Sequence, residues 1–458
     1  MKELFPKDFA WGAATSAYQI EGAACQDGKG ESVWDVFCRQ PGRVYGGHTG
    51  DVACDHYHRF DEDFSIMESL GIRNYRFSFA WPRLLPEGTG AVNQKGLEFY
   101  DRLIDSMMAH GIMPHATLFH WDYPYALFCR GGWLNDDSPG WFAEYAELLA
   151  RRYGDRVKNI FTLNEPQCFI GISCFDTFHA PGIKFPVKDC LAMAHNVMLA
   201  HGKSVQAIRA SAPGAAIGYA PTGRYYHPAS ERPYDVEAAR EATFDVNEGD
   251  WTFSVAWWSD PVILGRYPQK ALEQLEPLMP KIKPGDMELI SQPIDVYGQN
   301  IYNSAPVKAG GSGYEVVPYG PGHAKTGFSW PVTPECLYWA PKYLYERYKL
   351  PIVITENGLS AIDTVSLDGK VHDSSRIDYI QKHLLALARA AEDGVDLLGY
   401  FHWSLLDNFE WNSGYNERFG LVYVDFQTLE RTPKDSAAYY SKVVESNGGS
   451  LSGTWGDL

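Results

Sequence analysis

Residues 138–166 read SPGWFAEYAELLARRYGDRVKNIFTLNEP and contain both kinds of element from which the fold can be predicted. Pro139 suits the first position of a helix, Ser138 can cap it, and Gly154 suits its end. Four apolar side chains recur at helical spacing between them: Trp141, Tyr145, Leu148 and Leu149. The apolar run Asn159–Leu163 that follows has the length of a buried strand. The stretch therefore predicts one helix followed by one strand.

The same alternation continues along the whole chain. Apolar runs of strand length recur at seven more places: Phe9–Thr15, Ile72–Phe79, Ile112–Phe119, Ala216–Ala220, Ile294–Gly298, Pro351–Thr355 and Asp396–Phe401. A second clear helix is expected from Asp373 or Ser374 to Gly394. Since no linker interrupts the series, eight strands alternating with helices favour the α/β class and a single (β/α)8 TIM barrel over a doubly wound sheet with a second domain.

We expect this barrel to form one domain over residues 1–447, with GGSLSGTWGDL at 448–458 as a loose tail. The stretch Pro221–Pro293 is long for a connection, so elaborated βα loops are expected after the later strands. In such a barrel, chemistry belongs to the carboxyl ends of the strands.

Composition narrows the classes of function. The formal net charge of −17 would repel phosphates and anionic lipids, so neither nucleic acid nor a membrane is expected as a partner. The N-terminus has no apolar signal core, and no long apolar run is present, so we expect a cytoplasmic protein. Aromatic residues make up 14% of the chain, which suits a sugar ring as ligand, although a large core also consumes aromatics. The sequence is compatible with a homo-oligomer.

Metal and cofactor motifs are weak. The eight cysteines include no CxxC pair, so buried free thiols are expected. The histidines of Cys54–His58 stand two apart and would not share a helix face, which favours a structural role over a metal site. The acidic run Asp61–Asp63 is typical of a solvated helix face. The spacing of these cysteines and histidines gives no reason to expect a metal. No nucleotide-binding glycine loop is found either, so we expect no cofactor.

Two glutamates lie where a barrel would place its chemistry. Glu165 lies in FTLNEP and Glu356 in IVITENG, each directly after an apolar strand. Pro166 would keep Glu165 out of helical geometry, and Gly358 would permit a sharp turn after Glu356. Hydrolysis of a glycosidic bond needs one carboxylic acid and one carboxylate on the opposite face of the ring. The pair therefore indicates a glycosidase, and two capping or ion-paired glutamates are the alternative.

Six ordered blocks resemble glycoside hydrolase family 1, the β-glucosidases and their relatives, from Phe9 to about Asp425. They are FAWGAATSAYQIEG, YRFSFAWPR, LFHWDYP, TLNEP, ITENG and HWSLLDNFEWNSGYNERFGL. The resemblance implies retaining hydrolysis of terminal β-D-glucosides, such as cellobiose-like disaccharides and aryl or alkyl glucosides. It also implies β-galactosidase or β-fucosidase side activity, transglycosylation, and a part in the degradation of cellulose.

The resemblance gives the two glutamates unequal roles. Glu165 would be the acid/base and Glu356 the nucleophile, roughly 5 Å apart, because a retaining mechanism needs direct attack. Arg76 would favour the ionised form of Glu356, and Tyr302 would donate a hydrogen bond to it. Asn164 would bind the sugar 2-hydroxyl.

A set of substrate-binding residues is also implied by the resemblance. It consists of Gln19, His120, Trp121, Asn164, Tyr302, Trp330, Trp403, Glu410, Trp411 and Phe419. Trp403 would form the platform under the ring, and Trp330 would be a wall for the leaving group. Outside a matching block, each would more simply be a core residue or a satisfied polar residue.

Two alternatives to a β-glucosidase stay open. A 6-phospho-β-glucosidase is disfavoured by Glu410 and Trp411, because a carboxylate would repel the phosphate. An inactive sugar-binding protein of the same fold would be expected to lack a catalytic glutamate, and both are present. The chain departs from the family at residues 167–178, QCFIGISCFDTF, which border the leaving group. The preference for the leaving group is therefore not carried over.

Overall fold

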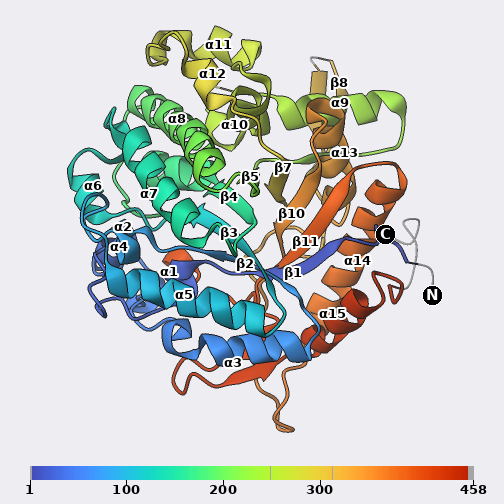
Figure 1. Cartoon of the computed structure of the whole chain (residues 1–458). Coiled ribbons are helices and arrows are strands. Elements are labelled where there is room, and N and C mark those ends of the chain that lie inside the picture. Colours follow the sequence, from blue (N-terminus) through green and yellow to red (C-terminus); the bar gives the residue numbers. More distant parts are fainter. Residues whose placement is uncertain (1–2, 248, 312, 452–458) are drawn as a thin grey trace.

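The computed structural model describes residues 3–247, 249–311 and 313–451, and a closed barrel of eight parallel strands forms its centre. In barrel order the strands are β1 (Ala10–Ala14), β11 (Leu397–Trp403), β10 (Ile352–Asn357), β7 (Val296–Asn300), β5 (Ala216–Ala220), β4 (Asn159–Asn164), β3 (Met113–Phe119) and β2 (Asn74–Ser78). Helices surround this barrel (Figure 1). Each strand overlaps one of the predicted runs, so the predicted TIM barrel is confirmed.

Helices of very different length connect the strands. The α-helices are α1 (Ala17–Ile20), α2 (Val33–Cys38), α3 (His56–Ser69), α4 (Trp81–Leu84), α5 (Gln94–Ala109), α6 (Tyr125–Cys129), α7 (Ser138–Tyr153), α8 (Val187–Ser211), α9 (Pro233–Phe244), α10 (Val255–Ser259), α11 (Gln269–Leu275), α12 (Asp286–Ile290), α13 (Cys336–Tyr348), α14 (Ser374–Glu392) and α15 (Asp435–Glu445). Short 3-10 or π segments are η1 (Tyr45–Gly47), η2 (Gly132–Leu134), η3 (Gln167–Phe175), η4 (Trp251–Phe253), η5 (Asp260–Leu264), η6 (Glu276–Leu278) and η7 (Trp411–Ser413). In the described part of the chain, none of these helices combines the length and the apolar character that a membrane span requires.

Helix α7 has the predicted extent but not the predicted cap. Asp137 precedes the helix, Ser138 is its first residue, and no side-chain hydrogen bond caps it. The Ser138 hydroxyl donates to the Trp133 carbonyl at 3.4 Å instead. The helix is held by its apolar face, where Tyr145 stacks on Trp81 with 4.8 Å between ring centroids. Packing therefore replaces capping at this position.

The barrel interior holds its own apolar cluster. Its buried members are Ala14, Phe161, Ala220, Val296, Val353, Phe401, Trp403 and Phe419. Phe161 fits there because Gly218 and Gly298 on nearby strands carry no side chain: a Cβ would lie 2.6 Å and 2.9 Å from its ring. The lumen is thus a packed core and not a pore, as in barrels of this kind.

The elaboration expected after the later strands is present. Between β5 and β7 the chain forms β6 (Tyr226–Pro228) and helices α9 to α12. Strand β6 joins β8 (Ala305–Gly310) and β9 (Gly313–Val316) in a separate three-stranded sheet. Strands β12 (Val422–Val424) and β13 (Arg431–Pro433) form a two-stranded one. Of the tail expected at 448–458, residues 452–458 lie outside the described residues.

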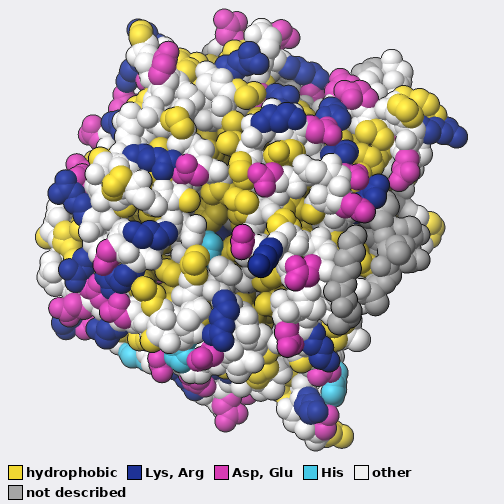
Figure 2. Space-filling model, turned by 45° about the vertical axis from the view of Figure 1, so that its right-hand side comes forward, with side chains coloured by type: hydrophobic (Ala, Val, Ile, Leu, Met, Phe, Trp, Pro, Cys, Tyr) yellow, Lys and Arg dark blue, Asp and Glu magenta, His cyan; other side chains and the backbone are white. Residues whose placement is uncertain are grey.

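Charged side chains of both signs lie among one another on the face shown in Figure 2, with hydrophobic side chains between them. Ion pairs between exposed groups recur along the chain, as between Lys95 and Asp27 at 2.9 Å and between Lys382 and Asp378 at 2.8 Å. Such exposed pairs contribute at most about 1 kcal/mol each, so the stability of the fold rests on the buried clusters.

The two strands that lead to the glutamates are irregular at their carboxyl ends. The pairing of β4 with β5 shifts between Phe161 and Asn164, and the pairing of β10 with β7 shifts between Ile354 and Glu356. Bulges of this kind re-aim side chains and are frequent next to active sites. The regular pairing of both strands is therefore interrupted in the last residues before each glutamate.

Candidate active site

A cavity of about 470 Å³ lies at the carboxyl ends of the barrel strands. Ten of the predicted site residues line it: His120, Trp121, Glu165, Tyr302, Trp330, Glu356, Trp403, Glu410, Trp411 and Phe419. The other three, Gln19, Arg76 and Asn164, are fully buried and hydrogen-bond to residues of this wall. The structure thus brings the whole predicted set together.

Glu356 is bonded to a cation and to a phenol. Arg76 Nη1 donates to Glu356 Oε1 at 2.7 Å, and the Tyr302 hydroxyl donates to Oε2 at 2.7 Å. Arg76 Nη2 also donates to Asn164 Oδ1 at 2.6 Å, which fixes the guanidinium. Burial raises the pKa of Glu356, but the charge of Arg76 and the two hydrogen bonds favour the carboxylate and oppose that rise. These contacts equip Glu356 to stay ionised.

The donors that the described residues offer to the carboxyl group of Glu165 are neutral. Asn300 Nδ2 donates to Glu165 Oε1 at 2.7 Å, and the Cys168 thiol donates to Oε2 at 3.0 Å. Burial, followed by the charge of Glu356, raises the pKa of Glu165 to about 7. Near neutral pH this carboxyl group can therefore hold a proton.

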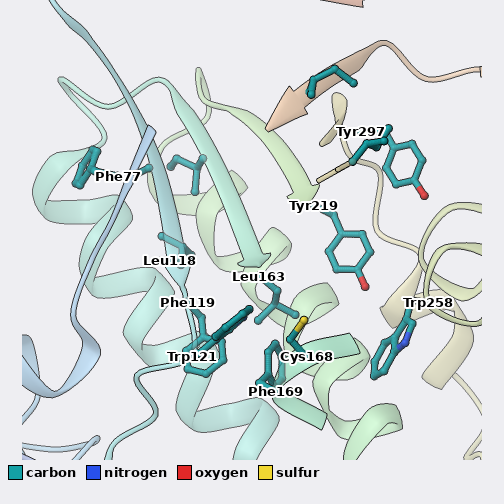
Figure 3. Packing of buried hydrophobic residues seen from close by; sticks show 14 of the residues in the cluster. Phe77, Leu118, Phe119, Trp121, Leu163, Cys168, Phe169, Tyr219, Trp258 and Tyr297 are labelled. Atoms are coloured by element: carbon teal, nitrogen blue, oxygen red, sulfur yellow. The ribbon is translucent and has the colours of Figure 1, made fainter. Parts of the chain in front are cut away.

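The backbone of Glu165 lies in the left-handed region, with φ at +46°. This conformation is uncommon for a residue with a side chain and is kept only where the surroundings enforce it. The Glu165 N–H donates to the Ala220 carbonyl at 2.9 Å, which ties β4 to β5 at this point. The π-helical segment η3 begins two residues later. In Figure 3, its Cys168 and Phe169 lie beside Leu163 of β4.

Gly358 serves a different purpose from the expected one. Its φ is not positive, so no left-handed turn requires a glycine there. A Cβ at this position would instead lie 1.8 Å from the Trp403 carbonyl oxygen. The missing side chain lets the end of β10 pack directly on the end of β11. Glu356 and Trp403 are therefore held on two strand ends in contact.

One end of the cavity is a network of buried polar side chains. Gln19 Nε2 donates to Glu410 Oε2 at 3.3 Å and to Asn408 Oδ1 at 3.0 Å. Asn164 Nδ2 donates to His120 Nε2 at 3.1 Å. Burial lowers the pKa of His120 and raises that of Glu410 well above its ordinary value, so both favour their neutral forms. The repulsion expected between Glu410 and a sugar phosphate is therefore weaker than the sequence indicated.

Asn300 is a site residue that the sequence analysis missed. Besides Glu165, its Nδ2 reaches Asn164 Oδ1 at 3.1 Å, and its Oδ1 accepts from the Thr355 hydroxyl at 2.6 Å. It therefore links β4, β7 and β10. Its signal in the sequence is the one that marked the glutamates, because Asn300 is the last residue of a barrel strand.

The model of the glycosyl hydrolase family 1 matches residues 1–449. The chain belongs to this family. It is 46% identical to β-glucosidase A of Acetivibrio thermocellus over 98% of this chain and 99% of that one. It is 39% identical to a bifunctional β-D-glucosidase/β-D-fucosidase of Bifidobacterium breve over 97% and 99%. A solved β-glucosidase from Thermotoga maritima in complex with deoxynojirimycin superposes with a TM-score of 0.89 at 43% identity, over 98% of this chain and 100% of that one.

The other end of this family 1 cavity has mostly apolar walls. Trp330 and Phe328 stack with 5.0 Å between ring centroids. Ile172, Phe253 and Pro331 complete this wall. All five residues lie outside the barrel strands. Trp330 was predicted as a wall and Ile172 lies in the segment 167–178 that was predicted to border the leaving group, whereas Phe253, Phe328 and Pro331 were not predicted. The apolar end is therefore built by connections, whereas the polar end combines Asn164 of β4 with Gln19 of α1 and with Glu410 from the segment after β11.

His56, close to Cys54, belongs to a structural cluster. Within the described ranges, no three His, Cys, Asp or Glu side chains lie together as they would around a metal ion. His56 Nδ1 contacts Asp63 Oδ2 at 2.7 Å, and Arg431 Nε donates to Asp63 Oδ1 at 2.8 Å. Asp63 is fully buried, so the expectation of a solvated acidic face is wrong for this residue.

Proposed function

We propose that the chain is a retaining β-glucosidase. It would remove terminal β-D-glucosyl residues from cellobiose-like disaccharides and from aryl or alkyl glucosides. The observation that carries the proposal is the unequal pair of carboxyl groups in one cavity, Glu356 bonded to Arg76 and Glu165 bonded to neutral donors only. Glycosidases of the retaining kind need such a pair, one member ionised and one protonated.

In the proposed first step, Glu356 attacks the anomeric carbon. A carbon–oxygen bond forms between Glu356 and the sugar while the glycosidic bond breaks, and Glu165 gives its proton to the departing oxygen. The side chain of Asn164, positioned by Arg76 and Asn300, would bind the 2-hydroxyl, where contacts strengthen in the transition state.

In the proposed second step, water replaces Glu356 on the sugar. Capture of the sugar neutralises Glu356, so the charge that supported the proton on Glu165 is gone and Glu165 can act as a base. It takes a proton from water, whose oxygen attacks the anomeric carbon and releases Glu356. If a sugar hydroxyl takes the place of water, the result is transglycosylation.

The polar end of the cavity supports an unphosphorylated glucose as the sugar. Gln19, His120, Glu410 and Trp411 offer hydrogen-bonding groups around the expected position of the ring, and Trp403 offers a flat face. The relative from Bifidobacterium breve is described as both a glucosidase and a fucosidase. We include β-fucosidase and β-galactosidase side activity in the proposal, and a place in the degradation of cellulose through cellobiose.

The proposal extends to organisation and location. We assign residues 1–447 to one catalytic domain and 448–458 to a tail. All eight cysteines are free, and six of them are buried, which is in keeping with a reducing cytoplasm. Cell fractionation with a tagged chain tests the location.

A panel of substrates tests the function. The wild type should hydrolyse 4-nitrophenyl β-glucoside fastest, the β-fucoside and β-galactoside measurably, and the 6-phospho-β-glucoside least. NMR of the first product should show the β-anomer, because two displacements restore the configuration. Hydrolysis of none of these substrates, or initial release of the α-anomer, would contradict the proposal.

A further inference from the structure

Gln167, two residues after Glu165, binds a loop of the cavity wall. Its side chain is fully buried. Gln167 Nε2 donates to the Thr222 carbonyl at 2.6 Å, and its Oε1 accepts from the Thr222 N–H at 3.3 Å. Both ends of the side-chain amide thus bind the backbone of one residue. Thr222 begins the stretch 222–225, every residue of which lines the cavity.

The same loop is bonded to Asn300. The Thr222 hydroxyl donates to the Asn300 carbonyl at 2.9 Å, and the Asn300 N–H donates to the Pro221 carbonyl at 3.1 Å. Asn300 Nδ2 in turn donates to Glu165 Oε1 at 2.7 Å. The contacts form a closed circuit from Glu165 through Gln167, Thr222 and Asn300 back to the carboxyl group of Glu165.

Glu165 is part of this circuit, and its conformation has to be stabilised by contacts with other residues. Glu165 has a φ of +46°, and side chains adopt that backbone conformation only where the surroundings enforce it. Its proton must also meet the departing oxygen within hydrogen-bond distance. Small displacements of a reacting group cost large factors in rate. A contact that fixes both the backbone and the Asn300 partner of Glu165 therefore favours proton transfer by keeping Glu165 in position.

We propose that Gln167 is a positioning residue for the acid/base glutamate, acting through Thr222 and Asn300. The inference rests on the proposed function. Gln167 is not among the residues that line the cavity, so it acts without touching the sugar. Replacement of Gln167 should then lower kcat/KM most for substrates whose leaving group must be protonated as it departs.

The test compares leaving groups in the variant Gln167→Met, which keeps the length of the side chain and removes both hydrogen bonds. Values of kcat/KM, which report the first chemical step, are measured for cellobiose and for 2,4-dinitrophenyl β-glucoside. Cellobiose needs protonation of its leaving oxygen, and dinitrophenolate departs without it. We expect a loss of about 10- to 100-fold for cellobiose and less than about threefold for the dinitrophenyl substrate.

Two further variants keep the test decisive. Gln269→Met, on the exposed start of α11, removes a surface hydrogen bond to Glu273 and should change neither value. Thr222→Val removes only the hydroxyl link to Asn300 and should show the same selective loss on a smaller scale. It also serves if Gln167→Met does not fold.

The outcomes separate the two proposals. A selective loss for cellobiose supports the positioning role of Gln167. Equal losses for both substrates, or none, overturn it and leave the β-glucosidase proposal intact. A wild type that hydrolyses neither substrate overturns the β-glucosidase proposal itself.

Discussion

Glu165 and Glu356 are the same residue type, both buried at strand ends of one barrel, but their neighbours differ. Glu356 is bonded to the Arg76 guanidinium and the Tyr302 hydroxyl, whereas Glu165 is bonded to an amide and a thiol. A buried cation favours the charged form of a carboxyl group far more than a neutral donor does. Burial alone therefore does not determine which glutamate is ionised and which is protonated. The side chains that other parts of the chain place beside each glutamate determine it.

The largest effect should come from removing the group that stays ionised. Glu356→Gln keeps the shape and deletes the proposed nucleophile, so kcat/KM for 4-nitrophenyl β-glucoside should fall on the order of 10⁵-fold. Glu98→Gln, at an exposed position of α5, is the matched control and should keep full activity. Full activity of Glu356→Gln would contradict the role of Glu356 as the nucleophile.

The protonated member should matter in a substrate-dependent way. Glu165→Gln should lower kcat/KM for cellobiose by about 10³-fold, within the usual range for general acid catalysis, and that for 2,4-dinitrophenyl β-glucoside much less. In the wild type, activity should decline as pH rises through about 7, because Glu165 loses its proton there. That decline should be absent from the pH profile of Glu165→Gln. Its persistence would assign the titration to another group.

Replacing the cation should make the two glutamates more alike. Arg76→Met removes the charge that opposes the effect of burial on Glu356, so the pKa of Glu356 should rise. The acidic limb of the pH profile should move to higher pH, since the nucleophile must be ionised, and kcat/KM at the optimum should fall about 10²-fold. Arg76→Lys retains a charge and should show a smaller shift of the limb. A limb that does not move in Arg76→Met would show that this cation does not set the ionisation of Glu356.

The smallest effect concerns the thiol on Glu165. Cys168→Val deletes a hydrogen bond that favours the carboxylate form, so the pKa of Glu165 should rise and the basic limb should move to higher pH. Activity at the optimum should change by less than about fivefold, since a thiol is a weak donor. Cys174→Val, which alters another buried thiol of η3, should leave the limb in place. A downward shift in Cys168→Val would contradict the role of the thiol as a donor.

Local pattern was sufficient to predict the barrel, because each strand is an apolar run between turn residues. The two glutamates followed from the same reasoning, since the carboxyl ends of barrel strands are where side chains meet. The unequal roles of the glutamates, and the partners Arg76 and Tyr302, came from the family resemblance. The structure places both partners within hydrogen-bond distance of Glu356.

What could not be predicted depends on contacts between distant segments. Asp63 lies in an acidic run that suits a solvated helix, and only the fold brings Arg431 to it. The bond between Gln167 and Thr222 joins residues 55 positions apart. Ser138 has the right type for a cap, but the helix begins one residue earlier than expected, with Asp137 at the N-cap position. No local pattern contains these partners.

The contact of Gly358 with the Trp403 carbonyl has a consequence for how new substrate preferences can arise. Any larger side chain at position 358 would collide with the backbone of β11. Substitutions of Gly358 that would alter the contact between the ends of β10 and β11 should therefore not be tolerated. The apolar wall around Trp330 and Phe253 is built by connections between strands, which tolerate changes of sequence and length better than the strands do. Natural variation and laboratory selection should therefore diversify what is attached to the glucose while the glucose itself remains the recognised unit.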